Sequence, residues 1–346
     1  MMKSPLIDNM HTEIKEITKE SLLEAKEIVL NGGVVGMPTE TVYGLGGNAF
    51  DDEAVRRIFE VKGRPSDNPL IAHVHEGYDL SQIIDYDPPY AKKLREAFLP
   101  GPLTLVYPST NKVSKYVSCG LNTLAIRVPA HKGAQAFLRE VGVPIAAPSA
   151  NLSKHVSPTS AKHVYDDFCG KISLILDGGE CEGGIESTVC DVTGEIPVIL
   201  RPGLVTQEMI ADMVGACGVY EHKTDANEKV KSPGVLYKHY SPRCETALYS
   251  SSDKQKALAF IEEAGRTQRV GLLCEGALAQ SYNGSAMVFS LGATEDEMAA
   301  SLYARLRDAE ESCDLLVAIE PQKQDGKMVG VINRLRKACV SVDIPH

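Results

Sequence analysis

Short apolar runs alternate along this sequence with amphipathic stretches, and this alternation constrains the fold more than any other feature. A capping-box spelling at Ser21 predicts one helix start. A second helix is predicted to begin at Asp51 or Asp52 and to end at Gly63. Strands are predicted for the apolar runs at 34–37, 70–74, 103–107, 123–128, 144–147, 173–176, 188–192 and 197–200. This order predicts an α/β fold on one twisted, mixed sheet rather than a barrel.

The alternation is interrupted after residue 205. A helix is predicted at 207–214, and the polar stretch 221–231 that follows has no apolar periodicity, which is typical of a linker. The next segment, SPGVLYKHYSP at 232–242, is too rich in aromatic residues and proline for a passive spacer. A second α/β pattern follows, with strands at 270–274, 287–290 and 315–319 and a helix at 295–311. We therefore expect a first domain at 14–205, a linker at 206–243 and a smaller doubly wound domain at 244–346.

The composition indicates a folded protein. Of the 346 residues, 43% are apolar and 24% are charged, so the chain can bury a core and is neither a disordered tail nor a fibre. The net charge of −10 argues against a basic surface that coats nucleic acid. The nine cysteines form no C-x-x-C pair, which favours reduced thiols in a cytosol over a zinc ribbon or a disulfide framework. Because no long apolar run or signal-peptide pattern is present, we expect a cytoplasmic protein without membrane contact.

The familiar nucleotide and metal motifs are missing. The sequence has no G-x-x-x-x-G-K-[ST] loop and no H-E-x-x-H, and Gly44-Leu-Gly-Gly47 does not complete G-x-G-x-x-G. Any nucleotide site must therefore be built differently. Polar segments rich in glycine and proline follow the predicted strands instead, and ligands of open α/β sheets bind at strand ends.

Two of these segments carry candidate binding groups, and each also has a plainer interpretation. Residues 38–46 offer two hydroxyls, a carboxylate and a phenol after a strand, although a simple turn explains them as well. Residues 62–70 place cationic side chains that suit phosphate oxygens at the end of a helix. The alternative is a solvated helix end, where cations also favour the helix dipole. The rigid loop between Pro65 and Pro69 favours a binding site.

Further candidates lie in the second half of the first domain. Arg127 shares a strand face with Thr123 and Ala125, so it is either a solvent-facing residue or a carboxylate clamp in a pocket. Ser157, followed by Pro158, predicts a helix start, whose N–H groups could also share a phosphate. Glycine-rich loops, which also suit plain hairpins, bring three more polar side chains towards the same cleft: Ser187, Thr188 and Arg201.

Taken in order, these segments resemble the threonylcarbamoyl-adenylate synthase family, built on a YrdC-type domain, in its longer two-domain form. The resemblance is carried by PTETVYGL, KGRPSDNPL, PGPLTLV, NTLAIRVP, PSAN, IESTV, ILRPG and SPGVLYKHYSP. It implies a mixed-sheet YrdC-like domain with a central cavity at 14–205, a linker at 206–243 that forms a lid over the active site, and a Rossmann-like α/β domain at 244–346. The implied enzyme is a nucleotidyltransferase that makes threonylcarbamoyl-AMP and pyrophosphate from L-threonine, bicarbonate and ATP with Mg²⁺. The implied partners are proteins that transfer the threonylcarbamoyl group to adenosine 37 of tRNAs decoding ANN codons, and the resemblance leaves room for weak contact with tRNA.

The resemblance also assigns individual positions. Threonine-binding positions fall on Thr41, His73, Arg127 and Ser187. Positions around ATP fall on Lys62, Arg64, Asn68, Thr123, Ser149, Asn151, Ser157, Arg201, His239 and Tyr240, and no side chain is assigned to a metal. For His73 the alternative is an ordinary histidine on a strand face. Some relatives have a hydroxyl where this chain has Ala147, so that contact is missing or made by the backbone. The implied reaction needs no protein nucleophile, so catalysis rests on positioning and charge neutralisation, chiefly by Lys62 and Arg64 with Arg201 and Mg²⁺.

Two other functions compete with this interpretation. An RNA-binding module or translation-linked regulator would use a concave basic surface, but the net charge and the scarcity of clustered basic residues outside 56–64 weigh against it. A carbamoyl-transfer enzyme of the hydrogenase-maturation type shares the YrdC-like domain. Those larger proteins carry zinc-finger-like cysteines and an acylphosphatase region, and neither is seen in this sequence.

Overall fold

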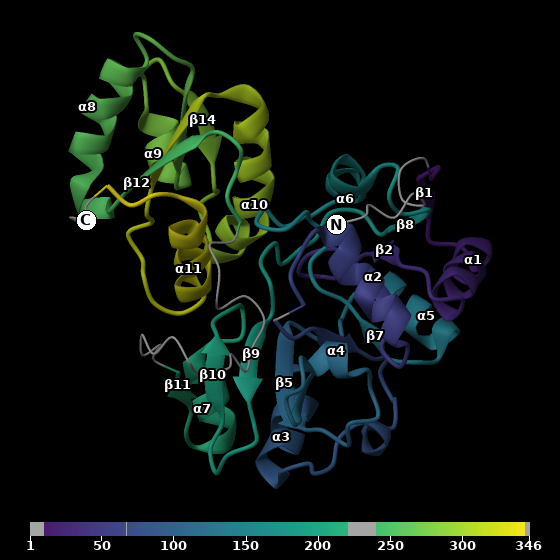
Figure 1. Ribbon diagram of the computed structural model, residues 1–346. Helices are drawn as coiled ribbons and strands as arrows, with labels where there is room; N and C mark the ends of the chain where they lie inside the picture. Colours follow the sequence, from purple (N-terminus) through teal and green to yellow (C-terminus); the bar gives the residue numbers. More distant parts are fainter. Residues whose placement is uncertain (1–9, 67, 221–239, 343–346) are drawn as a thin grey trace. The chain divides into compact units, whose positions relative to one another are not determined.

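The computed structural model describes residues 10–66, 68–220 and 240–342, and the chain divides into two compact units. The first unit holds most of the described chain before residue 220, and the second holds the described chain from residue 240. Two tripeptides from the earlier part of the sequence, Lys154–Val156 and Gly183–Ile185, belong to the second unit. Each unit is built on its own sheet (Figure 1).

An eleven-stranded sheet forms the centre of the first unit in its described residues, in the spatial order β1-β8-β2-β3-β7-β4-β6-β5-β9-β10-β11. The strands are β1 (Glu13–Glu16), β2 (Val35–Met37), β3 (Gly44–Asn48), β4 (Ile71–His73), β5 (Leu103–Pro108), β6 (Thr123–Arg127), β7 (Ile145–Ala146), β8 (Leu174–Asp177), β9 (Thr188–Asp191), β10 (Val198–Arg201) and β11 (Gly218–Val219). The pairs β4–β6 and β5–β9 are parallel, whereas β5–β6 and β9–β10 are antiparallel. The predicted mixed α/β sheet is therefore confirmed.

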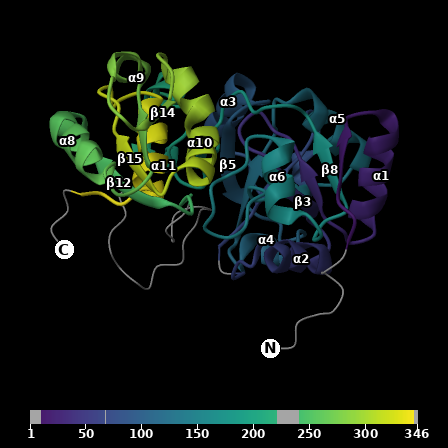
Figure 2. The ribbon, with the colours of Figure 1, turned by 90° about the horizontal axis from the view of Figure 1, so that it is seen from above.

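Helices cover both faces of this sheet. Successive side chains of a strand point to opposite faces, and the central strands are apolar on both, so each face needs a cover. In β8, Leu174 and Leu176 belong to one apolar cluster and Ile175 to another. The helices are α1 (Lys19–Leu30), α2 (Asp52–Lys62), α3 (Pro89–Phe98), α4 (Lys115–Ser118), α5 (Lys132–Val141), α6 (Ala161–Phe168) and α7 (Gln207–Val214), with a short 3₁₀ helix at Leu80–Gln82. Helices α1 and α5 lie side by side (Figures 1 and 2) and share the first cluster, whereas α2, α3, α6 and α7 contribute to the second.

The second unit is a parallel sheet in the order β12-β15-β13-β14. Its elements are β12 (Glu245–Tyr249), α8 (Lys254–Ala264), β13 (Val270–Cys274), α9 (Gly276–Ser281), β14 (Met287–Ser290), α10 (Glu295–Ser312), β15 (Leu315–Ile319) and α11 (Met328–Ala338). Alternate residues of β15 pack in one cluster with α8 and α9. Helices α10 and α11 pack on each other, and α10 contacts β13 and β14. The predicted second α/β domain is confirmed as a separate parallel sheet.

Two predicted helix starts are wrong by about one turn. Helix α1 is capped by Thr18, whose hydroxyl accepts from the Ser21 N–H while the Ser21 hydroxyl accepts from the Thr18 N–H. Ser21 is thus the third residue of the helix and not its cap. Ser157 is not a cap either, because α6 is capped by Ser160. Just before that cap, the Pro158 carbonyl accepts a hydrogen bond from the backbone N–H of Tyr43.

Strand β3 was not among the predicted strands, because its sequence, Gly-Leu-Gly-Gly-Asn, has the composition of a turn. The glycines are explained by close packing. A Cβ atom on Gly46 would lie 2.8 Å from Ile145 Cγ2 and 3.1 Å from Met37 Sδ. Strand β3 pairs with β2 on one side and β7 on the other, so it lies in the middle of the sheet. The antiparallel β2–β3 pair presents residues 38–43 as the connecting turn.

Candidate active site

The predicted threonine-site residues come from the central strands. The turn between β2 and β3 carries Glu40 and Thr41, strand β4 ends at His73, and β6 ends at Arg127. His73 and Arg127 are register partners across the parallel pair β4–β6. Their side chains therefore start from adjacent points at the same end of the sheet, where open α/β sheets bind ligands.

Arg127 is buried, with 3% of its surface exposed, and each of its guanidinium nitrogens faces an oxygen atom. Nε donates to the Gly101 carbonyl at 3.3 Å, and Nη1 donates to Thr41 Oγ1 at 2.7 Å. Nη2 lies 2.7 Å from a carboxylate oxygen of Glu40. This burial excludes the solvent-facing interpretation of Arg127. The arginine already pairs with a carboxylate in the interior, and a carboxylate clamp requires this kind of contact.

The Glu40 carboxylate is ionised and largely enclosed, with 13% of its side chain exposed. Burial by itself raises the pKa of Glu40, but the adjacent Arg127 guanidinium outweighs burial and holds that pKa below its usual value. Although the charged atoms are 2.7 Å apart, they are poorly aligned, and no described residue makes a well-formed hydrogen bond to either Glu40 oxygen. The contact is an ion pair with unused hydrogen-bonding capacity.

His73 is buried beside this ion pair, with 4% of its surface exposed. Burial, and then the positive charge of Arg127, lower the pKa of His73 to about 3, so the imidazole is neutral at physiological pH. Its Nδ1 atom has no hydrogen-bond partner in the described part of the chain. An ordinary strand histidine would normally have one, so this orphaned nitrogen favours a ligand-facing role.

Lys62, the last residue of α2, points inward. Its Nζ atom donates to the backbone carbonyls of Ser149 and Asn151, each at 2.5 Å, and 3% of the residue is exposed. Burial, and then the charge of Arg64, hold the pKa of Lys62 well below its usual value. The interpretation as a solvated helix end therefore fails for Lys62. The PSAN segment is itself fixed, since the Ser149 hydroxyl donates to Asn151 Oδ1 at 2.5 Å.

Ser157 and Glu186 form a buried pair near Lys62. The Ser157 hydroxyl donates to Glu186 Oε1 at 2.7 Å, and the exposed fractions are 0% and 6%. The charge of Glu186 raises the pKa of Lys62 and so partly opposes the effect of burial. Ser157 thus donates to a carboxylate and does not cap a helix. The predicted phosphate contact at a helix N-terminus capped by Ser157 is therefore not supported.

Ser187 is held by strands β5 and β10. Its hydroxyl lies 2.8 Å from Thr104 Oγ1, and Arg201 Nη2 donates to the same hydroxyl at 3.2 Å and to the Ser187 carbonyl at 2.9 Å. All three side chains are buried. The neighbouring Thr188 hydroxyl donates to the Val205 carbonyl at 2.6 Å, so it serves the backbone rather than a ligand. Ser187 and Arg201 are therefore brought together as expected from the sequence.

Asn68 is fully buried, yet neither its amide nitrogen nor its amide oxygen bonds to any described residue. A buried amide without partners is costly, so it usually faces water or a ligand. Arg64 donates to the Asn68 carbonyl at 3.0 Å, and this contact closes the loop that follows α2.

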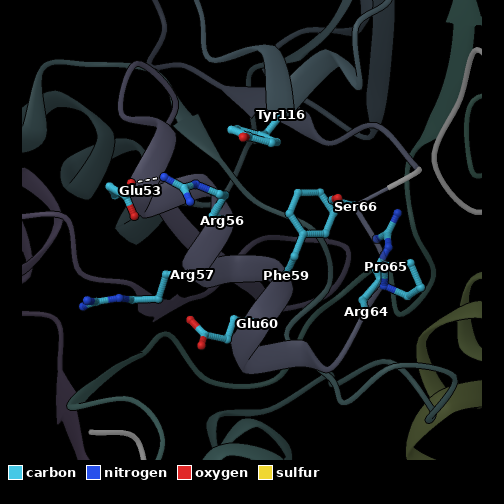
Figure 3. A pocket seen from close by; sticks show the side chains of 9 residues that line it. All are labelled: Glu53, Arg56, Arg57, Phe59, Glu60, Arg64, Pro65, Ser66 and Tyr116. Atoms are coloured by element: carbon cyan, nitrogen blue, oxygen red, sulfur yellow. Dashed lines mark hydrogen bonds and ion pairs between the residues drawn. The ribbon is translucent and has the colours of Figure 1, made fainter. Parts of the chain in front are cut away.

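Arg64 also lines a surface pocket of about 540 Å³ on the outer side of α2 (Figure 3). Its guanidinium lies 5.8 Å from the centre of the Phe59 ring. Arg56 lies over the Tyr116 ring and pairs with Glu53, whereas Arg57 is directed away from that ring in Figure 3. Lys62 and Arg64 therefore leave the end of α2 in different directions, one into the interior and one along this pocket.

The remaining predicted residues are less informative. Thr123 begins β6 on the same strand face as Arg127, and it is partly exposed. Tyr240 belongs to the second unit, where its ring packs against Tyr303 with the ring centres 5.3 Å apart. Residues 221–239, which include His239 and make up half of the predicted lid at 206–243, lie outside the described residues.

Three polar side chains in these contacts were not among the predicted site residues: Glu40, Thr104 and Glu186. Each is next to, or paired with, a residue that was. Glu40 had a signal in the sequence, as the carboxylate between the two threonines of PTET, but a turn explained it equally well. No group of three or more histidine, cysteine, aspartate or glutamate side chains that could hold a metal occurs in the described ranges. Across the same residues, no helix has the length and apolar character needed to cross a membrane.

Comparison with known protein families matches almost the whole chain. A family model described as "Telomere recombination" matches residues 27–203. A second, described as "Threonylcarbamoyl-AMP synthase, C-terminal domain", matches residues 205–340. The two matches meet between β10 and α7, so the second match also covers β11, an edge strand of the eleven-stranded sheet.

Relatives of similar length are found in several organisms. The chain is 42% identical to a threonylcarbamoyl-AMP synthase of Pyrococcus abyssi over 324 residues, covering 91% of this chain and 92% of the relative. It is also 42% identical to the Bacillus subtilis protein of that name over 322 residues, covering 92% of each. Among solved structures, Sua5 of P. abyssi complexed with L-threonine is 38% identical, with a TM-score of 0.88 over 96% of this chain and 100% of that one.

Proposed function

The chain belongs to the threonylcarbamoyl-AMP synthase family, and on this premise we propose that it makes threonylcarbamoyl-AMP and pyrophosphate from L-threonine, bicarbonate and ATP. One observation carries the proposal more than any other. Arg127 is a buried guanidinium that already holds a carboxylate at 2.7 Å. The carboxylate of an amino acid is of the same chemical class as the Glu40 group. One solved relative, Sua5 of P. abyssi, which matches 96% of this chain, is a complex with L-threonine.

The threonine pocket is formed by the groups around Arg127. The guanidinium binds the substrate carboxylate, and Thr41, His73 and Ser187 provide hydrogen-bonding groups around the rest of the amino acid. Because the His73 ring is neutral, it adds no second positive charge and can accept or donate a hydrogen bond. An Arg-to-carboxylate pair in a buried site gives both affinity and orientation.

The nucleotide is placed by cations and orphaned polar groups. Phosphate charge is neutralised by Lys62, Arg64 and Arg201. Further contacts come from two amides and three hydroxyls: Asn68, Asn151, Thr123, Ser149 and Ser157. The suppressed pKa of Lys62 fits this role, because the negative charge of a triphosphate restores the ammonium form. His239 and Tyr240 stay predictions from the sequence for contacts with ATP.

Magnesium enters this scheme with the nucleotide. The described residues supply no three-membered cluster of metal ligands, and Mg²⁺ in ATP-dependent enzymes is held largely by substrate phosphates and water. The side chains present therefore fit a cation delivered as its ATP complex, with Glu186 as a nearby carboxylate. Bound there, the ion would neutralise charge on the triphosphate.

The chemistry needs positioning rather than a protein nucleophile. The threonine amine captures carbon dioxide derived from bicarbonate, the carbamate oxygen attacks the α-phosphorus of ATP, and pyrophosphate leaves. Cations that stabilise the developing phosphate charge and a site that excludes water account for the rate. The product then supplies the threonylcarbamoyl group that tRNA-modifying proteins transfer to adenosine 37 of tRNAs decoding ANN codons, in the cytoplasm.

Pyrophosphate release is the direct test. The full-length protein is assayed with ATP and Mg²⁺, with threonine and bicarbonate each omitted in turn, and the product is weighed by mass spectrometry. Release that requires both co-substrates and gives the mass of threonylcarbamoyl-AMP is the expected result. ATP cleavage that ignores threonine would contradict the proposal, as would no cleavage at all by folded protein. A salt-sensitive shift of tRNA without turnover would favour the RNA-binding alternative.

A further inference from the structure

The proposed reaction begins with the loss of a proton. At neutral pH the α-amino group of threonine is an ammonium, which has no lone pair with which to attack carbon dioxide. A group in the site must accept this proton before the first bond forms. The inference below rests on the proposed function and concerns which residue does so.

Glu40 is the acidic side chain at the Arg127 end of the site. Its carboxylate is 2.7 Å from Arg127 Nη2 and largely buried, and well-formed hydrogen bonds from described residues reach neither oxygen. Buried carboxylates are normally satisfied by several donors, because leaving a charge unbonded in the interior is costly. The Arg127 guanidinium and the backbone of Glu40 and Ala130 favour the charged form of Glu40, but because none makes a hydrogen bond of good geometry, the two oxygens have capacity for a further donor.

The substrate has the right geometry to supply it. The ammonium and carboxylate of an α-amino acid are attached to the same carbon atom. If the carboxylate binds Arg127, the ammonium lies within a few bonds of the guanidinium, next to Glu40. We propose that the threonine carboxylate displaces Glu40 from Arg127, and that Glu40 then binds the threonine ammonium and accepts its proton.

The titratable groups that face Glu40 support this order of events. They are Arg127 on β6, His73 on β4 and the Cys181 thiol in the loop after β8. His73 is neutral with a pKa of about 3, which makes it a poor proton acceptor, and burial raises the pKa of Cys181 so that its thiol stays protonated. Arg127 is then the main group that lowers the Glu40 pKa against the opposing effect of burial, with smaller contributions from the backbone of Glu40 and Ala130. Once a substrate carboxylate neutralises Arg127, the effect of burial is less strongly opposed, the Glu40 pKa rises and Glu40 becomes a stronger base.

The step balances without any further reagent. The proton moves from the threonine nitrogen to a Glu40 oxygen, which leaves a neutral amine and a neutral carboxylic acid. The nitrogen lone pair then forms the bond to carbon dioxide. The second proton lost from nitrogen combines with the hydroxide released when bicarbonate yields carbon dioxide, and water forms. Glu40 returns its proton to solvent after the product leaves.

The test compares wild type with Glu40→Gln, which keeps the size of the side chain and removes its basicity. Glu27→Gln, at an exposed position of α1, is the matched control. Threonine-dependent pyrophosphate release is measured from pH 6.5 to 10, giving kcat and the threonine KM separately. Calorimetry of threonine binding and a thermal unfolding curve accompany each variant.

At pH 7 we expect Glu40→Gln to lower kcat by about 10²- to 10⁴-fold, the usual contribution of a general base. The deficit should shrink about tenfold per pH unit as the free amine becomes abundant, while threonine affinity changes by less than about tenfold. Glu40→Asp should retain more activity than Glu40→Gln. It should also keep the wild-type pH profile. Glu27→Gln should match wild type throughout.

Other outcomes overturn the inference. An unchanged kcat in Glu40→Gln, or a constant deficit at every pH, would show that Glu40 takes no proton. Unfolding of both Glu40 variants would assign the residue to the stability of the site and overturn the proposal. If wild type itself releases no threonine-dependent pyrophosphate, the proposed function fails and this inference with it, whereas an active wild type with an unaffected Glu40→Gln removes the inference alone.

Discussion

The Ser157 hydroxyl donates a 2.7 Å hydrogen bond to the Glu186 carboxylate, and both side chains are buried. The two residues come from separate loops, one before α6 and one before β9, so the bond joins segments that are 29 positions apart in the sequence. Hydrogen bonds to a buried charge contribute more to stability than those between neutral groups. The pair therefore ties the predicted nucleotide side of the site to the Ser187 side.

Removal of this bond should be measurable. Ser157→Ala takes one donor from a buried carboxylate, and we expect the free energy of unfolding to fall by about 1.5–3 kcal/mol in urea titrations. Ser285→Ala, at an exposed serine of the second unit, should change this free energy by less than about 0.5 kcal/mol. An equal, small effect of both substitutions would mean that the Ser157–Glu186 bond adds nothing to the fold.

Arg127 should determine threonine affinity. Arg127→Ala removes the guanidinium that is expected to hold the substrate carboxylate, and loss of one member of a buried charge pair costs about 2–5 kcal/mol. The threonine KM should therefore rise at least about 30-fold, with a much smaller change in the ATP KM. Arg266→Ala, on the exposed surface of the second unit, should leave both constants unaltered. A threonine KM that stays at the wild-type value would remove Arg127 from the amino-acid pocket.

The Glu40–Arg127 pair should also give stability a particular pH dependence. Glu40 has a folded-state pKa below its unfolded value, so its contribution is present above the unfolded pKa near 4.5 and is lost as the pH falls through the folded-state pKa. In Arg127→Ala the main influence that lowers the Glu40 pKa is lost, and burial, which raises it, is opposed only by the backbone of Glu40 and Ala130, so the charged carboxylate stabilises the fold less at neutral pH. The difference in unfolding free energy between wild type and Arg127→Ala should be largest near pH 7 and should shrink towards pH 4. A difference that is constant across this range would contradict the ion pair.

Much of the first sheet could be predicted from the sequence because its central strands are buried on both faces. The runs ending at His73, Arg127 and Arg201 are apolar apart from a few polar positions, which marks them as strands without any alignment. Strand β3 could not be predicted in this way, because the close approach of Ile145 and Met37 to Gly46 is a tertiary contact that the local sequence does not reveal. Local composition indicated a turn, and tertiary packing overrode it.

The site was predictable to the extent that its residues lie in recognisable segments. Arg127 had two interpretations in the sequence, and only its burial against Glu40 decides between them. That contact depends on the β2–β3 turn reaching the end of β6, which is a matter of strand order and register. Glu186 was missed for the same reason, since its partner Ser157 has the local pattern of a helix cap, and only the fold brings the two together.

Lys62 should change its protonation when ATP binds. Burial holds its pKa well below the usual lysine value in the protein without nucleotide, which favours the neutral amine. The phosphates of ATP favour the ammonium form, and binding should therefore take up protons. Calorimetric titration of Mg²⁺-ATP in two buffers of different ionisation enthalpy measures the number of protons that the complex takes up. At pH 8 ATP itself is fully deprotonated and does not contribute to this number.

The uptake should disappear in Lys62→Met, which keeps the length and apolar stem of the side chain but cannot be protonated. Lys19→Met, at the exposed start of α1, is the control and should bind ATP with the wild-type proton count. Lys62→Met should also weaken ATP binding, since its ammonium no longer opposes the phosphate charge. Proton uptake that persists in Lys62→Met would locate the titrating group elsewhere in the nucleotide site. No uptake in wild type would mean that Lys62 is already charged before ATP arrives, held in that state by its two carbonyl contacts and the nearby carboxylates of Asp167 and Glu186.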